Sequence, residues 1–189
     1  GGYTAPTDYA PNATGTLNSF MLVNDLDQLQ AVGANTQGSY ALGADIDASA
    51  TANWNGGAGF DPIGSSSAPF TGQFEGFGHS IANLVINRRD EQSVGLFGTG
   101  EGTAEIRNVH LTGGSITGDS FVGALIGDGY TAAGITVSNV SSSARVRGLG
   151  HGVGGLVGNG SRVNVSDSSA SGDVEGEDSV GGLMGDNWR

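Results

Sequence analysis

The chain has 189 residues, a length that suits one sizeable hydrophobic core or two small ones. Its 36 glycines have no Gly-X-Y period, which excludes collagen, and a hydrophobic content of 37% argues against a disordered tract. A formal net charge of −12 argues against nucleic acid or an anionic membrane as a partner, because both would be repelled. The absence of cysteine excludes disulfides and thiolate metal sites. No apolar run approaches the ~18 residues of a membrane span, so no membrane insertion is expected.

The sequence divides into a lead segment and one domain. Residues 1–19 are interpreted as a lead that is either flexible or an edge strand, and residues 20–189 as a single domain. Within this domain we expect a helical cap with a first strand over 20–50 and irregular first coils over 51–93. Regular repeats are expected over 94–189.

A short helix is predicted within residues 25–33. Leu26, Leu29 and Val32 fall on one helical face, aspartates occur early, and Gly33 stands near the end. These three side chains need a core to meet. We therefore expect the helix to lie across the N-terminal end of the domain, where the first strand would otherwise present an unpaired edge.

A glycine-rich motif recurs four times from residue 94 onward. It reads VGLFG, VGALIG, VGGLVG and VGGLMG, and its leucines are spaced 29, 31 and 27 residues apart, at Leu96, Leu125, Leu156 and Leu183. Asn or Asp recurs with a similar spacing, at Asn83, Asn108, Asn139 and Asp167. A third short segment ends on glycine in three periods, at Gly118, Gly148 and Gly176.

This repeat predicts an all-β fold, a right-handed parallel β-helix (β-solenoid) with coils of about 28 residues. Three short strand-like segments fill each period, without the long 3.6-residue stripes of helical repeats and without the ~40 residues of a propeller blade. Equivalent strands would stack at ~4.8 Å, and right-handed winding is the default for parallel crossovers. Glycine would supply the positive φ angles that sharp corners need.

Three side-chain rows follow from this stacking. The four motif leucines should form one inward ladder, and period-2 alternation should send their neighbours to the opposite face. That second row is apolar, so we expect it to be covered by another segment or to be an assembly face: Phe97, Ile126, Val157 and Met184. The Asn/Asp row is either a hydrogen-bonded ladder or a set of left-handed corner residues.

The closing glycines also predict a register. Aligning them sets Arg145 over Asp173 and Arg147 over Glu175, with the intervening valines inward. Two exposed ion pairs between neighbouring coils are expected, each contributing only ~0.2–1 kcal/mol.

Catalysis needs convergent groups that the sequence does not clearly supply. A glycosidase would use two carboxylates in one cleft, and the candidates are Asp45 with Asp47, Asp61, Glu75, and Asp173 with Glu175. Solvated acids are the favoured interpretation. His79 is expected to pack at a corner, and His110 and His151 lack metal-ligand spacing. No catalytic residue and no cofactor are therefore predicted.

Two binding alternatives stay open. Asp45 and Asp47 share a strand face and are weak candidates for Ca²⁺, a hard ion that takes oxygen ligands. Trp54, Phe60 and Phe77 are either a sugar-stacking platform or filling for the wider first coils, and we favour the filling.

The string YALGADIDASATANWNGGAGFDPIG, continued by PFTGQFEGFGHSIANLVIN, VGLFG and VGGLVG, resembles the GLUG-repeat regions of bacterial secreted exoproteins. These include filamentous-haemagglutinin-like adhesins of two-partner secretion systems, and the resemblance covers roughly residues 20–189. It implies a non-enzymatic structural or adhesive module that is secreted or exposed on the bacterial cell surface. Its partners would be a host or cell-surface ligand, or copies of itself. The alternative is a carbohydrate-active or carbohydrate-binding β-helix, similar to polysaccharide lyases.

Overall fold

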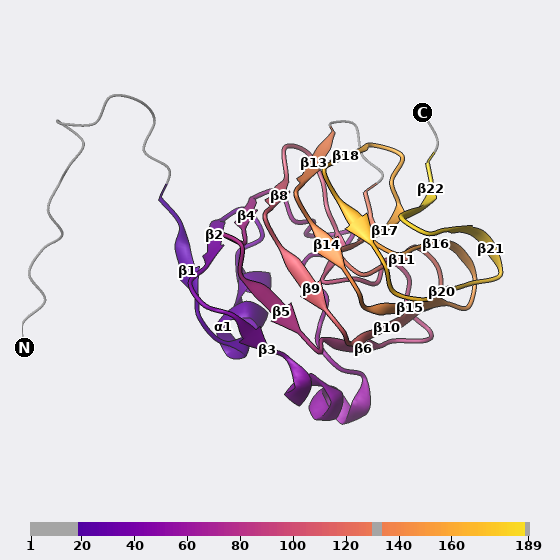
Figure 1. Cartoon of the computed structure of the whole chain (residues 1–189), viewed down its shortest axis with the longest axis horizontal. Helices are drawn as coiled ribbons and strands as arrows, with labels where there is room; N and C mark the ends of the chain where they lie inside the picture. The colour runs from indigo at the N-terminus through magenta and orange to yellow at the C-terminus, as the bar shows by residue number, and fades with distance from the viewer. Residues whose placement is uncertain (1–18, 130–133, 188–189) are drawn as a thin grey trace, which may run out of the picture.

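The computed structural model describes residues 19–129 and 134–187, and it is a parallel β-solenoid of about five turns. The predicted fold class is confirmed, with coils of about 30 residues rather than 28. Nearly all of the predicted lead segment 1–19 lies outside the described residues. In Figure 1 the coils follow one another from the indigo N-terminal end to the yellow C-terminal end.

Five sheets run along the solenoid, and all of their strand pairings are parallel. Sheet 1 contains β1 (Met21–Val23), β2 (Ser39–Leu42), β4 (Gln73–Glu75), β8 (Glu105–Arg107), β13 (Ile135–Ser138) and β18 (Val163–Ser166). Sheet 2 contains β3 (Ile46–Asp47), β5 (Ser80–Ala82), β9 (His110–Thr112), β14 (Ser141–Ser142) and β19 (Ser169–Ala170).

The other three sheets complete each coil. Sheet 3 contains β6 (Val85–Asn87), β10 (Ser115–Gly118), β15 (Arg145–Gly148) and β20 (Val174–Glu175). Sheet 4 contains β11 (Val122–Gly123), β16 (His151–Gly154) and β21 (Asp178–Gly181). Sheet 5 contains β7 (Phe97–Thr99), β12 (Ile126–Asp128), β17 (Val157–Asn159) and β22 (Met184–Asp186). A regular coil therefore has five short strands, where the sequence pattern predicted three.

The predicted helix is present at the N-terminal end. It consists of α1 (Leu26–Ala31) and the 3-10 turn η2 (Val32–Ala34), and Figure 1 shows it beside β1 and β3. Asp25 caps it, because its Oδ1 accepts a 2.8 Å hydrogen bond from the N–H of Gln28. Leu29 and Val32 are fully buried and Leu26 is partly buried against the core.

The segment predicted as irregular first coils contains an element that the sequence did not indicate. A 3-10 segment, η3 (Ser49–Gly57), is interrupted by left-handed conformations at Asn55 and Gly56. After it, isolated parallel bridges join Ile63 to Phe97 and Phe70 to Gly100. This stretch thus approaches the edge of sheet 5 without forming a full strand there.

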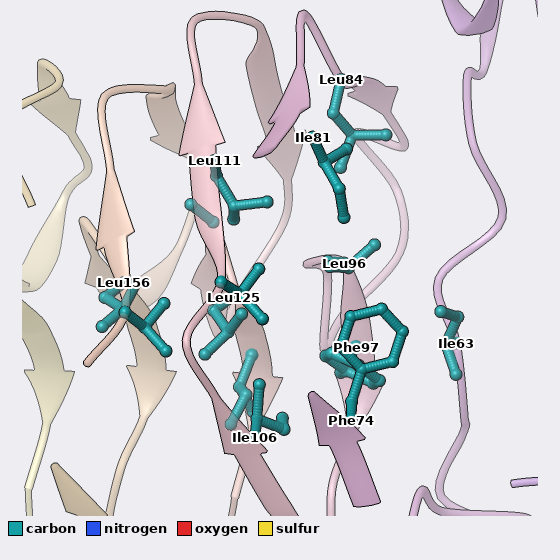
Figure 2. Close-up of a cluster of buried hydrophobic side chains, with 14 of the residues drawn as sticks. Ile63, Phe74, Ile81, Leu84, Leu96, Phe97, Ile106, Leu111, Leu125 and Leu156 are labelled. Carbon is teal, nitrogen blue, oxygen red and sulfur yellow. The ribbon is translucent and has the colours of Figure 1, made fainter. Parts of the chain in front are cut away.

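The leucine ladder runs through the core. Leu96, Leu125 and Leu156 are fully buried and lie in successive coils in Figure 2, whereas Leu183 is only partly buried. The N–H of Leu125 donates to the carbonyl of Leu156 over 2.9 Å, which fixes the register of the row.

The second apolar row is buried within the same chain. Phe97, Ile126 and Val157 are fully buried, so they cannot be an assembly face, and that part of the expectation was wrong. Each motif leucine precedes its sheet 5 strand, so strand alternation does not separate it from its neighbour. A Cβ atom on Gly127 would overlap the backbone at Ser93 and Val94, so only glycine fits at this position of sheet 5.

The predicted register of sheet 3 is confirmed. Val146 pairs with Val174 and Arg147 with Glu175. The ion pairs differ from the expectation, because Arg145 and Arg147 both reach Glu175, at 3.2 and 3.6 Å, and Arg145 does not use Asp173. Arginine is long enough to contact a carboxylate two positions along the neighbouring strand.

Candidate functional site

A groove runs along one side of the solenoid, where sheets 4 and 5 pack against each other. It consists of two adjoining cavities of about 380 and 670 Å³, which share Phe121 and Asp128. The smaller cavity extends toward the loop around Pro62, and the larger one toward the last coil. Strands of four coils and the loop around Pro62 therefore contribute to one continuous hollow.

One wall of the groove is a polar row in sheet 5. The strand register aligns Thr99, Asp128, Asn159 and Asp186. Asn159 Nδ2 donates to Asp128 Oδ1 over 3.0 Å, and Ser161 Oγ donates to Asn159 Oδ1 over 2.7 Å. Asn159 and Ser161 are buried, so these hydrogen bonds hold the wall rigid.

The opposite wall is a column of left-handed corner residues, each one position before the valine of a glycine motif. Their φ angles are +60, +55, +68 and +53°, at Ser93, Phe121, Gly152 and Ser179. Phe121 is the one bulky residue of the column, and a large side chain at positive φ is an unfavourable backbone state. A Cβ atom on Gly152 would lie 2.8 Å from Phe121 Cδ1 and 3.0 Å from Asp186 Oδ2. The missing side chain at Gly152 thus leaves room for this ring and this carboxylate.

Neighbouring side chains orient Phe121. Its ring meets the imidazole of His151 edge-on, with centroids 4.8 Å apart and planes at 86°. His151 Nδ1 lies 3.4 Å from Ser120 Oγ, which itself donates to Asp119 over 3.2 Å. The wall therefore offers an aromatic ring, an imidazole and hydroxyl groups beside the carboxylates of sheet 5.

The carboxylates that were predicted as Ca²⁺ candidates lie away from this groove. Asp45 accepts hydrogen bonds from the N–H and hydroxyl of Ser80 at 2.8 and 3.2 Å, and its Oδ1 lies 3.3 Å from His79 Nδ1. The pKa values of Asp45 and Asp47 are both lowered. The main cause is a backbone N–H hydrogen bond, from Ser80 to Asp45 and from Ser49 to Asp47. Within residues 19–129 and 134–187, no three His, Asp or Glu side chains are placed to hold a metal ion.

The Asn/Asp row combines both alternatives left open by the sequence. All four members have positive φ, from +49 to +59°, at Asn83, Asn108, Asn139 and Asp167. Asn139 Nδ2 also donates to Asn108 Oδ1 over 2.7 Å, and Asn108 Nδ2 donates to Glu75 Oε1 over 2.7 Å. The row is thus a corner column with a partial amide ladder.

The other candidate carboxylates do not converge on one cleft. Glu75 is buried, and its Oε2 accepts from Arg107 Nε over 2.7 Å, which gives it a structural role. Asp61 lines the groove and pairs with Arg88 at 3.0 Å. Glu175 pairs with the two arginines of sheet 3.

The favoured filling role is confirmed for Phe60 and Trp54, which pack in or against the core, but not for Phe77, and the alternative aromatic platform does not form. Trp54 stacks on Phe60 with centroids 6.5 Å apart, but Phe60 is fully buried and cannot receive a sugar. Phe77 is 60% exposed and meets Phe20 instead. Of the histidines, His110 Nδ1 lies 2.8 Å from Ser141 Oγ. The sequence analysis missed Phe121, although its signal was visible as a phenylalanine where the other repeats have serine or glycine.

No protein-family model matches the chain. Halomucin of Haloquadratum walsbyi is 40% identical over 181 residues, which cover 91% of this chain and 2% of halomucin. A protein of Evansella cellulosilytica, provisionally named a Gly-rich membrane protein, is 39% identical over 48% of this chain and 11% of its own length. The chain therefore spans a small part of both curated relatives.

The fold also has a likeness among solved structures. A crystal structure from Bacteroides ovatus, provisionally named an immunoglobulin A1 protease, matches 91% of this chain and 63% of its own chain. Its TM-score is 0.61 and its sequence identity 20%, a likeness of fold alone. In the described part of this chain, no helix has the length and apolar character needed to cross a bilayer.

Proposed function

We propose that the chain is a scaffold segment of a secreted or surface-exposed protein and acts in adhesion by stacking with further copies of itself. The observation that carries this proposal is the last described coil, whose strand edges and apolar side chains can receive a further coil. In the described residues all five sheets end there, at β18, β19, β20, β21 and β22. Apolar side chains of this coil are only partly covered, including Val165, Val174, Leu183 and Met184, and Val180 is 45% exposed.

The other end of the solenoid offers a complementary edge. Sheet 1 ends at β1, where Met21 is 47% and Leu22 60% exposed. An unpaired strand edge with apolar side chains is a template for pairing with another chain. Because the two ends differ, contact between them is head-to-tail and continues into a filament.

The names of the similar proteins support a surface location. One relative is named a mucin and the other a membrane protein. The resemblance to the GLUG-repeat regions of filamentous-haemagglutinin-like adhesins supports the same assignment. The adhesive role, with a host or cell-surface ligand as partner, rests on this resemblance and on the groove.

Sedimentation velocity over a concentration series tests the stacking. We expect association that increases at high salt, because acids on the last coil repel another acidic copy until salt screens them, among them Asp173, Glu175, Glu177 and Asp178. Val180→Asp should weaken this association. Thr112→Asp is the matched control, since it places the same charge on an exposed position of a middle coil.

Two results would contradict the proposal. One is a chain that stays monomeric at every concentration and salt level. The other is association that Val180→Asp and Thr112→Asp reduce equally, which would show that net charge rather than the last coil controls it. Beads coated with the chain test adhesion separately, by their retention on cell surfaces.

A further inference from the structure

We propose that the groove between sheets 4 and 5 binds an uncharged oligosaccharide, with Phe121 as the stacking platform and the polar row of sheet 5 as the hydrogen-bonding wall. The inference rests on the proposed adhesive function and names the ligand class. It differs from the alternative platform that the sequence left open, because Trp54, Phe60 and Phe77 take no part.

The shape of the groove fits an extended ligand. Its two cavities, of about 380 and 670 Å³, are in the size range of small-molecule sites and adjoin at Phe121. The polar row has one member in each of four successive coils, Thr99 to Asp186. Coils stack at ~4.8 Å, so the wall is on the order of 14 Å long. A chain of sugar units can follow such a wall, whereas a single ion would occupy one point of it.

Thr99 supplies an independent sign of a ligand. The side chain is 8% exposed and lines the smaller cavity. Among the residues that the structure describes, its Oγ1 is the buried side-chain polar atom without a hydrogen-bond partner. An unsatisfied buried hydroxyl is costly, so such groups usually have a partner outside the protein chain. This oxygen itself has almost no exposed surface, so a sugar hydroxyl can donate to it or accept from it once the side chains around the cavity shift.

The chemistry of the two walls favours a sugar. Phe121 keeps an unfavourable left-handed backbone, and Gly152 leaves the space that its ring occupies. An aromatic ring covers the apolar face of a pyranose, while amide and carboxylate groups bond its hydroxyls at the edge. The opposite wall supplies such groups at Asp128, Asn159 and Asp186.

Charge sets the class of sugar. The lining includes Asp61, Glu91, Asp128, Asp178 and Asp186, and the whole chain has a formal net charge of −12. Clefts lined by one sign of charge repel ligands of the same sign. Uronic acids and sulfated sugars are therefore disfavoured. The hydroxyl groups of neutral sugars can donate hydrogen bonds to the carboxylates.

An array of neutral and acidic oligosaccharides, probed with the full chain, tests the proposal. We expect binding to neutral members, measured afterwards by calorimetry with the best one. Phe121→Ala should weaken it by about tenfold or more. The matched control is Phe77→Ala, because Phe77 is also a phenylalanine at positive φ and is accessible, but it lies on another loop. This variant should bind like the native chain.

Thr99→Val separates a binding role from a structural one. It should weaken binding by about fivefold while leaving the melting temperature equal or higher, since the hydroxyl has no partner within the protein. Phe121→Ala should also leave self-association unchanged, so failure of the groove and failure of coil stacking are distinguishable.

Three results would overturn the assignment. The first is no binding to any neutral oligosaccharide, which leaves only a bound water at Thr99. The second is equal loss in Phe121→Ala and Phe77→Ala. The third is preferential binding of acidic members, or binding that appears only with added Ca²⁺ and is abolished by a chelator.

Discussion

The middle coils and the last coil carry the same motif in different surroundings. The valine that opens each motif is fully buried at Val94, Val122 and Val153, but 45% exposed at Val180. The sequence barely changes between these positions. What changes is whether another coil lies on top, so burial in this fold is a property of the neighbouring coil rather than of the residue.

At the N-terminal end a helix covers the core of the first coil, while the outer edge of β1 has no partner strand among the described residues. There Leu29 of α1 and Val32 of η2 are fully buried and meet the core of the first coil. At the last coil, the described residues include no such helix, and Leu183 remains partly exposed. The two ends therefore differ in how much hydrophobic stabilisation an outward-facing residue receives.

The largest expected effect is on the leucine ladder. Leu156→Ala should lower the free energy of unfolding by about 2–5 kcal/mol, because it leaves a cavity between two coils. Leu183→Ala should cost less than half as much, since the side chain is only partly buried. Urea denaturation of both variants measures the difference. Equal losses would mean that another segment covers the last coil in solution.

Ion pairs should follow the same division. Arg107→Met leaves Glu75 buried without its 2.7 Å partner and should cost about 2–4 kcal/mol, somewhat below the full range because Arg107 is 34% exposed. Arg145→Met removes an exposed pair with the last coil and should cost about 0.2–1 kcal/mol. Chemical denaturation at low salt checks both. The prediction fails if the two variants are equally stable.

The asparagine column allows a finer test. Asn139→Gly keeps the left-handed corner and loses the 2.7 Å bond to Asn108, at about 0.5–1.5 kcal/mol. Asn139→Ala should cost about 1–2 kcal/mol more, because alanine disfavours positive φ. Asp167→Gly in the last coil should be nearly neutral. Thermal unfolding of the three variants would refute the ladder if Asn139→Gly were also neutral.

The smallest expected effect concerns pH at the first coils. The pKa values of Asp45 and Asp47 are lowered, chiefly by the N–H groups of Ser80 and Ser49 respectively. Each ionised carboxylate therefore stabilises the fold at pH values above the ordinary pKa of aspartate. This stabilisation is lost as the pH falls through the lowered values. Asp45→Asn should flatten the fall in melting temperature below pH ~4. Ser80→Ala keeps the N–H donor and should flatten it less; the reverse order would assign the effect to the hydroxyl.

Much of the fold could be predicted because stacking repeats itself in the sequence. The spacing of the motif leucines and of the Asn/Asp column defines the coil, and Val146 with Val174 defines the register. Strands of two residues, such as β14 and β19, are too short to show a pattern of their own. This is why three strands per coil were predicted where five exist.

The candidate site was harder to predict because it depends on contacts between coils. The leucines lie before the strands of sheet 5, so the assumption of strand alternation placed Phe97 on the wrong face. The groove joins residues from the ends of several coils, such as Thr99 and Phe121, which no local motif brings together. The strained backbone at Phe121 becomes visible only in the structure.

The strict coil-to-coil pairing has a consequence for how the molecule opens. Within the five sheets each strand pairs with the equivalent strands of adjacent coils, and β6 and β7 also bond to residues 58–64, so stability is close to a sum of nearest-neighbour terms. Among the described residues, the last coil has one neighbouring coil and the middle coils have two. Amide hydrogen exchange is therefore fastest in β18–β22 and slows stepwise toward β8–β12, and a protease removes the yellow end of Figure 1 one coil at a time while the remainder stays folded.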